Sequence, residues 1–195
     1  VRLRARGEAS ASHLLLREAE AQAGEARAQA TLQARAEPQG WRVQGQGRLS
    51  RFDPLPWWPG APGSAWQRGP HRLDGQFDAQ LLWRGTPSAA AASASGLPAV
   101  EGRATLTLAD SVLAGVPLSG RLVLDGSAAR PHVDAALDAG GNRLALNWQA
   151  GASATGDHAE IDWQGPQLAA LAPLGRLLAE QVPALAAVWP ASGGA

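Results

Sequence analysis

One short run of residues combines side chains that commonly bind metal ions. His158, Glu160 and Asp162 are spaced two apart, which would place them on one side of a β-strand. An imidazole and two carboxylates on one face could share a divalent cation. The residues between them are apolar, however, so the same pattern is what a strand with one solvated face requires. We therefore interpret this run as an exposed strand face and predict no metal site.

Motifs for catalysis are incomplete. Residues 45–50 begin like a dinucleotide-binding loop, but the third glycine and a following helix are missing. Residues 151–155 carry threonine where a nucleophile elbow needs its second glycine. His13, His71 and His132 stand far apart, with no spacing typical of a catalytic group. We expect no enzymatic activity, no catalytic residue and no cofactor.

Tryptophan is the one aromatic residue used often, at eight positions. Trp57, Trp58 and Trp66 fall in a proline-rich stretch, residues 53–70, which is too rich in proline to form a strand. An aromatic platform of this kind could stack on a sugar ring, as in carbohydrate-binding modules. Alternatively, the three rings pack on a neighbouring sheet from an ordered loop or a short helical turn. The second interpretation is favoured.

The amino-acid composition argues against several classes of partner and chemistry. Seventeen arginines balance 17 acidic residues, and this neutrality argues against a nucleic-acid partner, since phosphate binding needs a basic face. The chain contains no cysteine, which excludes disulfides and thiolate chemistry. It contains no methionine either, so we expect a segment of a longer protein whose signal peptide or membrane anchor lies elsewhere. No stretch approaches the roughly 18 unbroken apolar residues of a membrane span.

Alternation of apolar and polar residues dominates the chain and predicts half-buried strands. Short turn-forming clusters at residues 125–127, 138–142 and 149–151 separate them, which is typical of an antiparallel meander. The strands predicted in this way lie within residues 26–36, 72–83, 100–108, 122–124, 133–137, 144–148 and 159–163.

Three stretches break the alternation. Residues 53–70 form the proline- and tryptophan-rich loop, and residues 86–98, mostly Ala, Ser and Pro, are expected to be a flexible loop. Residues 166–189 predict short helices, interrupted at Pro173. Four leucines there are spaced for one helical face: Leu168, Leu171, Leu174 and Leu178.

A seven-residue pattern recurs three times, with glycine at its third position: Gly75, Gly102 and Gly120. Its form is aliphatic, polar, Gly, Gln or Arg, apolar, any residue, apolar. Glycine inside a strand weakens that strand, so its recurrence indicates a bend or a close backbone approach. Repeated at one point of successive strands, it would curl the sheet. Chance recurrence in a glycine-rich chain is the alternative.

The expected fold is therefore mainly β, one repetitive segment over residues 1–195 curled into an elongated open groove. Many inward positions are Ala or Gly, which leaves a shallow trough that acyl chains could fill; codon bias toward alanine would give the same composition. The residues predicted to line this groove are Leu32, Leu73, Phe77, Leu81, Val100, Ala104, Leu106, Leu108, Leu122, Leu124, Val133, Leu137, Leu144, Leu146, Trp148, Ile161 and Trp163.

The pattern resembles the TamB family, within the large AsmA-like group of bridge-like lipid-transport proteins. Residues 120–124 followed by 129–137 resemble the family's recurring unit of a Gly-x-Leu-x-Leu strand, a small-residue turn with proline, and a second strand. Residues 162–163, followed by residues 168–174, resemble the amphipathic helix that interrupts the repeats. Residues 49–60 with 68–73 are similar to TamB sequences of β-proteobacteria.

This resemblance implies a groove in the periplasm, part of a protein anchored in the inner membrane by a segment absent from this chain. It implies phospholipid acyl chains as ligands, and outer-membrane protein assembly with the barrel partner TamA through other parts of the protein. Two other classes stay open: a structural or adhesin-like β-repeat whose apolar face packs on itself, and a carbohydrate-binding module.

Overall fold

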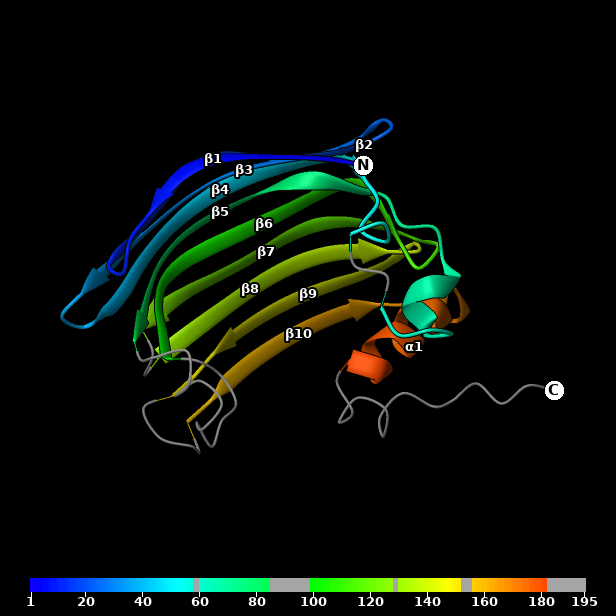
Figure 1. Cartoon of the computed structure of the whole chain (residues 1–195). Helices are drawn as coiled ribbons and strands as arrows, with labels where there is room; N and C mark the ends of the chain where they lie inside the picture. The colour runs from blue at the N-terminus through cyan, green and yellow to red at the C-terminus, as the bar shows by residue number, and fades with distance from the viewer. Residues whose placement is uncertain (58–59, 85–98, 128–129, 152–155, 182–195) are drawn as a thin grey trace.

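The computed structural model describes residues 1–57, 60–84, 99–127, 130–151 and 156–181. This part of the chain forms one open antiparallel sheet whose ten strands follow one another in chain order (Figure 1). The strands are β1 (Arg2–Ala9), β2 (His13–Ala23), β3 (Ala26–Glu37), β4 (Gly40–Phe52), β5 (Leu73–Arg84), β6 (Ala99–Leu113), β7 (Val116–Ser127), β8 (Arg130–Ala139), β9 (Asn142–Gln149) and β10 (His158–Gln164). The mainly β, meandering fold predicted from the alternation is confirmed.

Three of these strands were not predicted: β1, β2 and β4. In β2 the alternation changes phase, because the pairing with β3 shifts between Leu16 and Ala19, where two residues of β2 lie opposite one residue of β3. In β4 the apolar face carries Gly45 and Gly47, so little hydrophobic signal remains. In β1 the apolar positions are mostly Ala and Gly, whose hydropathy differs too little from that of polar residues to give a clear alternating pattern.

The turns follow from the residues at them. Gly140 and Gly141, between β8 and β9, both have positive φ, 56° and 78°, as the predicted turn at 138–142 requires. Ala114 and Gly115, between β6 and β7, adopt the same conformation with φ of 50° and 78°. The turn predicted at residues 125–127 is wrong, because these residues continue β7 and pair with β8.

The recurring glycines do not fall in one row, which corrects the expectation of three aligned bends. Gly75 and Gly120 lie on strands of the same direction, and both flank Leu108. Gly102 lies on the antiparallel strand between them, so it falls nearer the opposite end of the sheet, between Leu81 and Gly126. Because neighbouring strands of a meander run in opposite directions, the same position of the repeat lies toward opposite ends of the sheet on neighbouring strands.

Their local role is confirmed as close backbone approach. A Cβ at Gly120 would lie 2.2 Å from the carbonyl oxygen of Ala136, and one at Gly102 would lie 2.1 Å from that of Gln80. Both glycines have an extended backbone with positive φ, 138° at Gly120 and 128° at Gly102. Residues with a side chain rarely adopt this conformation.

Helical turns lie at one end of the sheet (Figure 1). They are η1 (Ala65–Arg68) in the connection from β4 to β5, and η3 (Leu168–Leu171) and α1 (Ala172–Gln181) after β10. We call the capped end the part formed by η1, η3, α1 and the β6–β7 and β8–β9 turns. The helical turn expected within residues 53–70 and the short helices expected after residue 166 are thus present; residues 86–98 and 182–189 lie outside the described residues.

Two details of the predicted helix are wrong. Pro173 does not interrupt it but is the second residue of α1, where a missing backbone N–H is tolerated. Leu168 does not share a buried face with Leu171, because Leu168 is 58% exposed while Leu171 is buried. Leu177 is also buried, and the side chain of Leu178 lies outside the described part of the chain. The change from 3-10 to α geometry between the two segments alters the spacing of the inward positions.

Candidate functional site: the apolar face of the sheet

The strand register places the predicted groove residues on one face of the sheet. Residues directly opposite each other in an antiparallel ladder point to the same side, so each row can be followed from strand to strand. One row reads Leu32, Gly45, Ala79, Ala104, Leu124, Val133, Trp148 and Ala159. The next reads Gly47, Phe77, Leu106, Leu122, Ala135, Leu146 and Ile161.

A third row lies toward the capped end, and it reads Leu49, Gly75, Leu108, Gly120, Leu137, Leu144 and Trp163. Two further predicted residues join the same face at its margins. Leu81 pairs with Val43, whereas for Val100 the structure describes only the backbone, which pairs with Trp83. Leu73 pairs with Phe52 just beyond a bulge in β4. We call this surface the apolar face.

The apolar face extends onto strands that sequence reasoning missed. Leu14 and Leu16 of β2, with Leu3 of β1, continue it toward the first edge of the sheet. Trp41 and Val43 of β4 also belong to it, opposite Ala36 and Ala34. The signal that could have found them is a two-residue period in which Ala and Gly count as apolar.

Large side chains on the apolar face are unusually exposed for such residues. Leu122 is 38% exposed, Ile161 63% and Trp163 45%. Apart from neighbouring strands, the substantial contacts between described elements join α1 to η1 and η3, so these elements form no second layer over the sheet. In the described part of the chain this side of the sheet is therefore a large exposed apolar surface, a feature typical of interaction sites.

Small residues keep the apolar face shallow. A Cβ at Gly47 would lie 2.4 Å from Cε1 of Phe77, so the Phe77 ring lies against the glycine backbone. A Cβ at Gly45 would lie 3.1 Å from Cδ1 of Leu32. The bulky residues therefore fold down over the glycines beside them, instead of standing apart as ridges.

The opposite, polar face carries long side chains and the larger hollows of the surface. One hollow of about 510 Å³ is lined by Gln46, Asp78 and Thr105, and extends to Arg17 and Arg48. Cross-strand ion pairs brace this face: Arg17 with Glu8 at 2.6 Å and Arg84 with Glu101 at 2.5 Å. Solvated pairs of this kind contribute little individually to stability.

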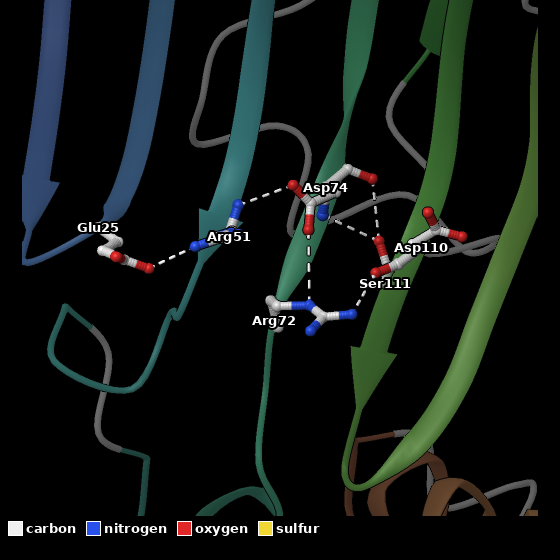
Figure 2. Close-up of polar contacts among 6 residues, drawn as sticks. All are labelled: Glu25, Arg51, Arg72, Asp74, Asp110 and Ser111. Atoms are coloured by element: carbon white, nitrogen blue, oxygen red, sulfur yellow. Dashed lines mark hydrogen bonds and ion pairs between the residues drawn. The ribbon is translucent and has the colours of Figure 1, made fainter.

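A polar cluster fixes the bulges near the capped end (Figure 2). Asp74 lies between two of them: its Oδ1 accepts the backbone N–H of Arg51 at 2.8 Å, in the β4 bulge. The buried hydroxyl of Ser111, next to the β6 bulge, bonds both to the N–H of Asp74 at 3.0 Å and to its carbonyl at 2.9 Å. Arg72 adds an ion pair to Asp74 at 3.6 Å and donates to the Asp110 carbonyl at 2.9 Å.

These bonds replace ladder hydrogen bonds that the bulges interrupt. Arg51 also pairs with Glu25 in the β2–β3 turn, so the contacts of the cluster extend from that turn to β6. Its effect is to bend the sheet at a fixed place without leaving buried polar groups unpaired. It carries no arrangement for catalysis.

The capped end contains the buried core. Ala65, Ala114 and Leu177 pack together, with Trp66 and Leu174 against them. The Nδ1 of the buried His71 accepts the N–H of Ala114 at 3.2 Å, and its Nε2 lies 2.7 Å from the carbonyl of Trp66. This pattern requires a neutral ring protonated at Nε2, a structural role.

The described tryptophans of the proline-rich stretch, residues 53–70, stack on other rings of the protein. Trp57 stacks on Phe52 with ring centroids 6.3 Å apart, and Trp66 stacks on His71 at 4.5 Å. Trp58 lies outside the described residues. The two described rings therefore belong to separate packing contacts and form no shared platform.

The predicted strand face of His158, Glu160 and Asp162 is found on β10, with all three residues exposed. Among the described residues no group of three His, Asp or Glu side chains is close enough to hold a metal ion. His132 is 3.1 Å from the Asp125 carboxylate, on strands distant from His13 and His71.

Compared with protein-family models, curated proteins and solved structures, the chain gives no significant match. None of the helices within the described ranges is long and apolar enough to cross a bilayer.

Proposed function

We propose that this chain is a segment of a hydrophobic groove that shelters phospholipid acyl chains between two membranes. The observation that carries the proposal is the apolar face itself, continuous over ten strands and uncovered by the described elements. The curl of the sheet turns this face into one wall of the groove. The segment acts as a passive surface, without catalysis or cofactor.

Energetics favour an acyl chain as the occupant. Transfer of a methylene from water to an apolar surface contributes about 0.8 kcal/mol, so a chain of a dozen or more is held strongly along such a face. The shallow surface made by the glycines at 45 and 47 suits a flexible chain that needs no shaped pocket. Phe77, Leu106 and Leu122 would contact it at the centre of the sheet.

The resemblance to the TamB family supplies the biological setting of the proposal. In that setting the segment lies in the periplasm, in a protein anchored to the inner membrane by another part of its chain. The groove carries phospholipid toward the outer membrane and supports outer-membrane protein assembly. Contact with the barrel protein TamA would use other parts of the protein.

The competing function is a structural β-repeat whose apolar face packs only on protein. The exposure of Phe77 and Leu122, on central strands of the sheet, favours the lipid groove, because a self-packed core would bury them. The carbohydrate-binding alternative has less support, since Trp57 and Trp66 stack on Phe52 and His71.

Site-specific photocrosslinking in cells tests the proposal. A photoreactive amino acid replaces Leu106 or Leu122, which oppose each other on the apolar face. The matched controls are Thr107 and Arg121, the neighbouring opposed pair on the polar face. Phospholipid adducts at the two leucines and not at the controls are expected.

Two results would reject the groove. Lipid adducts at all four positions would indicate general contact with a membrane. Protein adducts without lipid at both leucines would indicate a self-packed repeat.

A further inference from the structure

The polar face of the sheet is hollowed along its central strands β4 and β5. The hollow of about 510 Å³ described above adjoins a second hollow of about 470 Å³, because Thr31, Gln46 and Asp78 line both. Three successive cross-strand pairs lie beneath the two hollows: Arg48 with Gln76, Gln46 with Asp78, and Gln44 with Gln80. We call these six residues, with the hollows above them, the amide furrow. At about 3.3 Å per residue the three pairs extend about 13 Å along the strands.

The amide furrow is rich in amide groups and balanced in charge. Four of its six residues are glutamines, and its one arginine is offset by its one aspartate. The strands on either side continue this composition with further glutamines and threonines: Gln29, Thr31 and Gln33 of β3, and Thr105 and Thr107 of β6. A neutral surface of this kind offers hydrogen-bond donors and acceptors in similar numbers.

The side chains of the amide furrow are unbonded within the protein. Among the described residues, none of the six side chains forms a hydrogen bond or an ion pair with another part of the chain. Ion pairs form beside it, as between Arg17 and Glu8. Arg48 and Asp78 are diagonal neighbours across β4 and β5, yet they do not pair with each other. Their charges and the glutamine amides are therefore available to a ligand.

We propose that the amide furrow binds a linear, uncharged oligosaccharide. A hydroxyl group both donates and accepts hydrogen bonds, so it matches amides, which do the same. The guanidinium of Arg48 can donate to one sugar hydroxyl while the carboxylate of Asp78 accepts from its neighbour. Because the three pairs repeat every two residues along the strands, they suit a chain of similar units better than a single compact molecule.

Other ligand classes match the amide furrow less well. A phosphate or an acidic polymer requires an excess of basic side chains, whereas the six residues carry no net charge. An extended peptide requires pockets for alternate side chains, whereas every paired position here presents a polar group.

This site is separate from the surfaces discussed so far. It lies on the opposite side of the sheet from the apolar face, and it uses none of the tryptophans of residues 53–70. The inference therefore holds whether or not the apolar face binds lipid.

Saturation-transfer difference NMR on the full chain tests the proposal. The probes are maltotriose, cellotriose and triacetylchitotriose, which are uncharged linear trisaccharides with different linkages or substituents. An acetylated and amidated trialanine represents a neutral extended peptide. We expect at least one trisaccharide to bind at millimolar concentration and the peptide not to bind.

The double variant Gln46→Ala/Asp78→Ala removes the central amide and carboxylate of the furrow. It should weaken binding of that trisaccharide by about tenfold, through the loss of hydrogen bonds that include a charged acceptor. A second variant, Gln44→Ala/Gln80→Ala, removes the amides beneath the smaller hollow and should also weaken binding.

The matched control is Asp134→Ala/Asn147→Ala. It removes an acid and an amide that oppose each other in the same row of the polar face, but on β8 and β9. Because these strands lie outside the furrow, the dissociation constant should change by less than about twofold. Urea denaturation of each variant confirms that the sheet is retained.

Four results would overturn the proposal. Absence of binding by all three trisaccharides would mean that the furrow holds only water. Unchanged binding in both furrow variants would place the saccharide elsewhere, and an equal loss in the control would indicate nonspecific contact with the polar face. Binding of the peptide in place of the saccharides would assign the furrow to an extended polypeptide.

Discussion

The capped end and the apolar face differ in how they use hydrophobic residues. At the capped end Leu171 and Leu177 are buried by other side chains, and polar groups such as Asn142 are paired within the protein. On the apolar face Phe77 and Leu122 remain more than a third exposed. One region therefore has the packing of an ordinary core, and the other does not.

This difference concerns what each region contributes to folding. A core residue contributes through the surface that it removes from water, whereas a half-exposed residue leaves part of that free energy unused in the described part of the chain. Within the sheet the strands are joined by the ladder of backbone hydrogen bonds and, near the capped end, by the cluster around Asp74. The predictions below test this division, from the largest expected effect to the smallest.

The backbone of the sheet is expected to be the most sensitive element. Gly120→Ala should lower the free energy of unfolding by about 4 kcal/mol, since the residue has φ of 138° and the added carbon meets the Ala136 carbonyl. Urea denaturation followed by tryptophan fluorescence measures the loss. The control, Gly24→Ala, has positive φ in a turn with open space around it and should lose only about 1 kcal/mol. Similar losses would contradict the close approach.

Side-chain truncation compares the two regions directly. Leu177→Ala should lower the free energy of unfolding by about 3 kcal/mol, because it leaves a cavity in the capped end. Leu122→Ala should lower it by about 1 kcal/mol, because the side chain is already 38% exposed. The same denaturation experiment applies to both variants. A larger loss at Leu122 would mean that the apolar face packs as a core.

The alternation in the sequence was sufficient to predict which side of the sheet the described apolar side chains of each predicted strand occupy, because a strand has only two sides. It could not predict β2, where the bulge between Leu16 and Ala19 shifts the phase. It also could not place Gly102 relative to Gly75, since that depends on strand direction and register.

The capped end was much less predictable than the sheet. The leucine spacing indicated a helix, but the side that packs inward depends on contacts with η1, which is more than 100 residues away in the chain. Nothing local marks His71, Ser111 or Asn142 as buried. Such long-range polar pairs are decided by tertiary packing and leave no periodic signal in the sequence.

Asn142 should be the most important polar side chain of the capped end. Its Nδ2 donates to the carbonyls of Ala139 and Gln167, both at 3.0 Å, and its Oδ1 accepts the N–H of Gln167 at 2.9 Å. Asn142→Ala leaves these groups unpaired and should cost about 2 kcal/mol. Faster hydrogen exchange at the start of η3 would accompany the loss in urea denaturation.

The matched control is Asn147→Ala, on the same strand but exposed, which should change stability by less than about 0.5 kcal/mol. A loss of unfolding free energy for Asn142→Ala as small as that for Asn147→Ala would show that the link between β9 and η3 adds no stability.

The smallest effect is expected on the polar face, away from the capped end. Arg42 donates two hydrogen bonds to Glu37, at 2.6 and 3.0 Å, and these bonds lower the pKa of the Glu37 carboxyl. The carboxylate therefore favours the folded state fully above the pKa of an unfolded glutamate, and this contribution is lost as the pH falls through the lower pKa of the folded protein.

Arg42→Gln should raise the Glu37 pKa toward its usual value, as measured by NMR titration of the side-chain carboxyl carbon. Arg48→Gln, on the same face of β4, should leave that titration unchanged. Because both partners are solvated, added salt should also reduce the shift. A Glu37 titration insensitive to Arg42 would mean that the ion pairs of the polar face do not order it, and that the backbone ladder alone holds this part of the sheet.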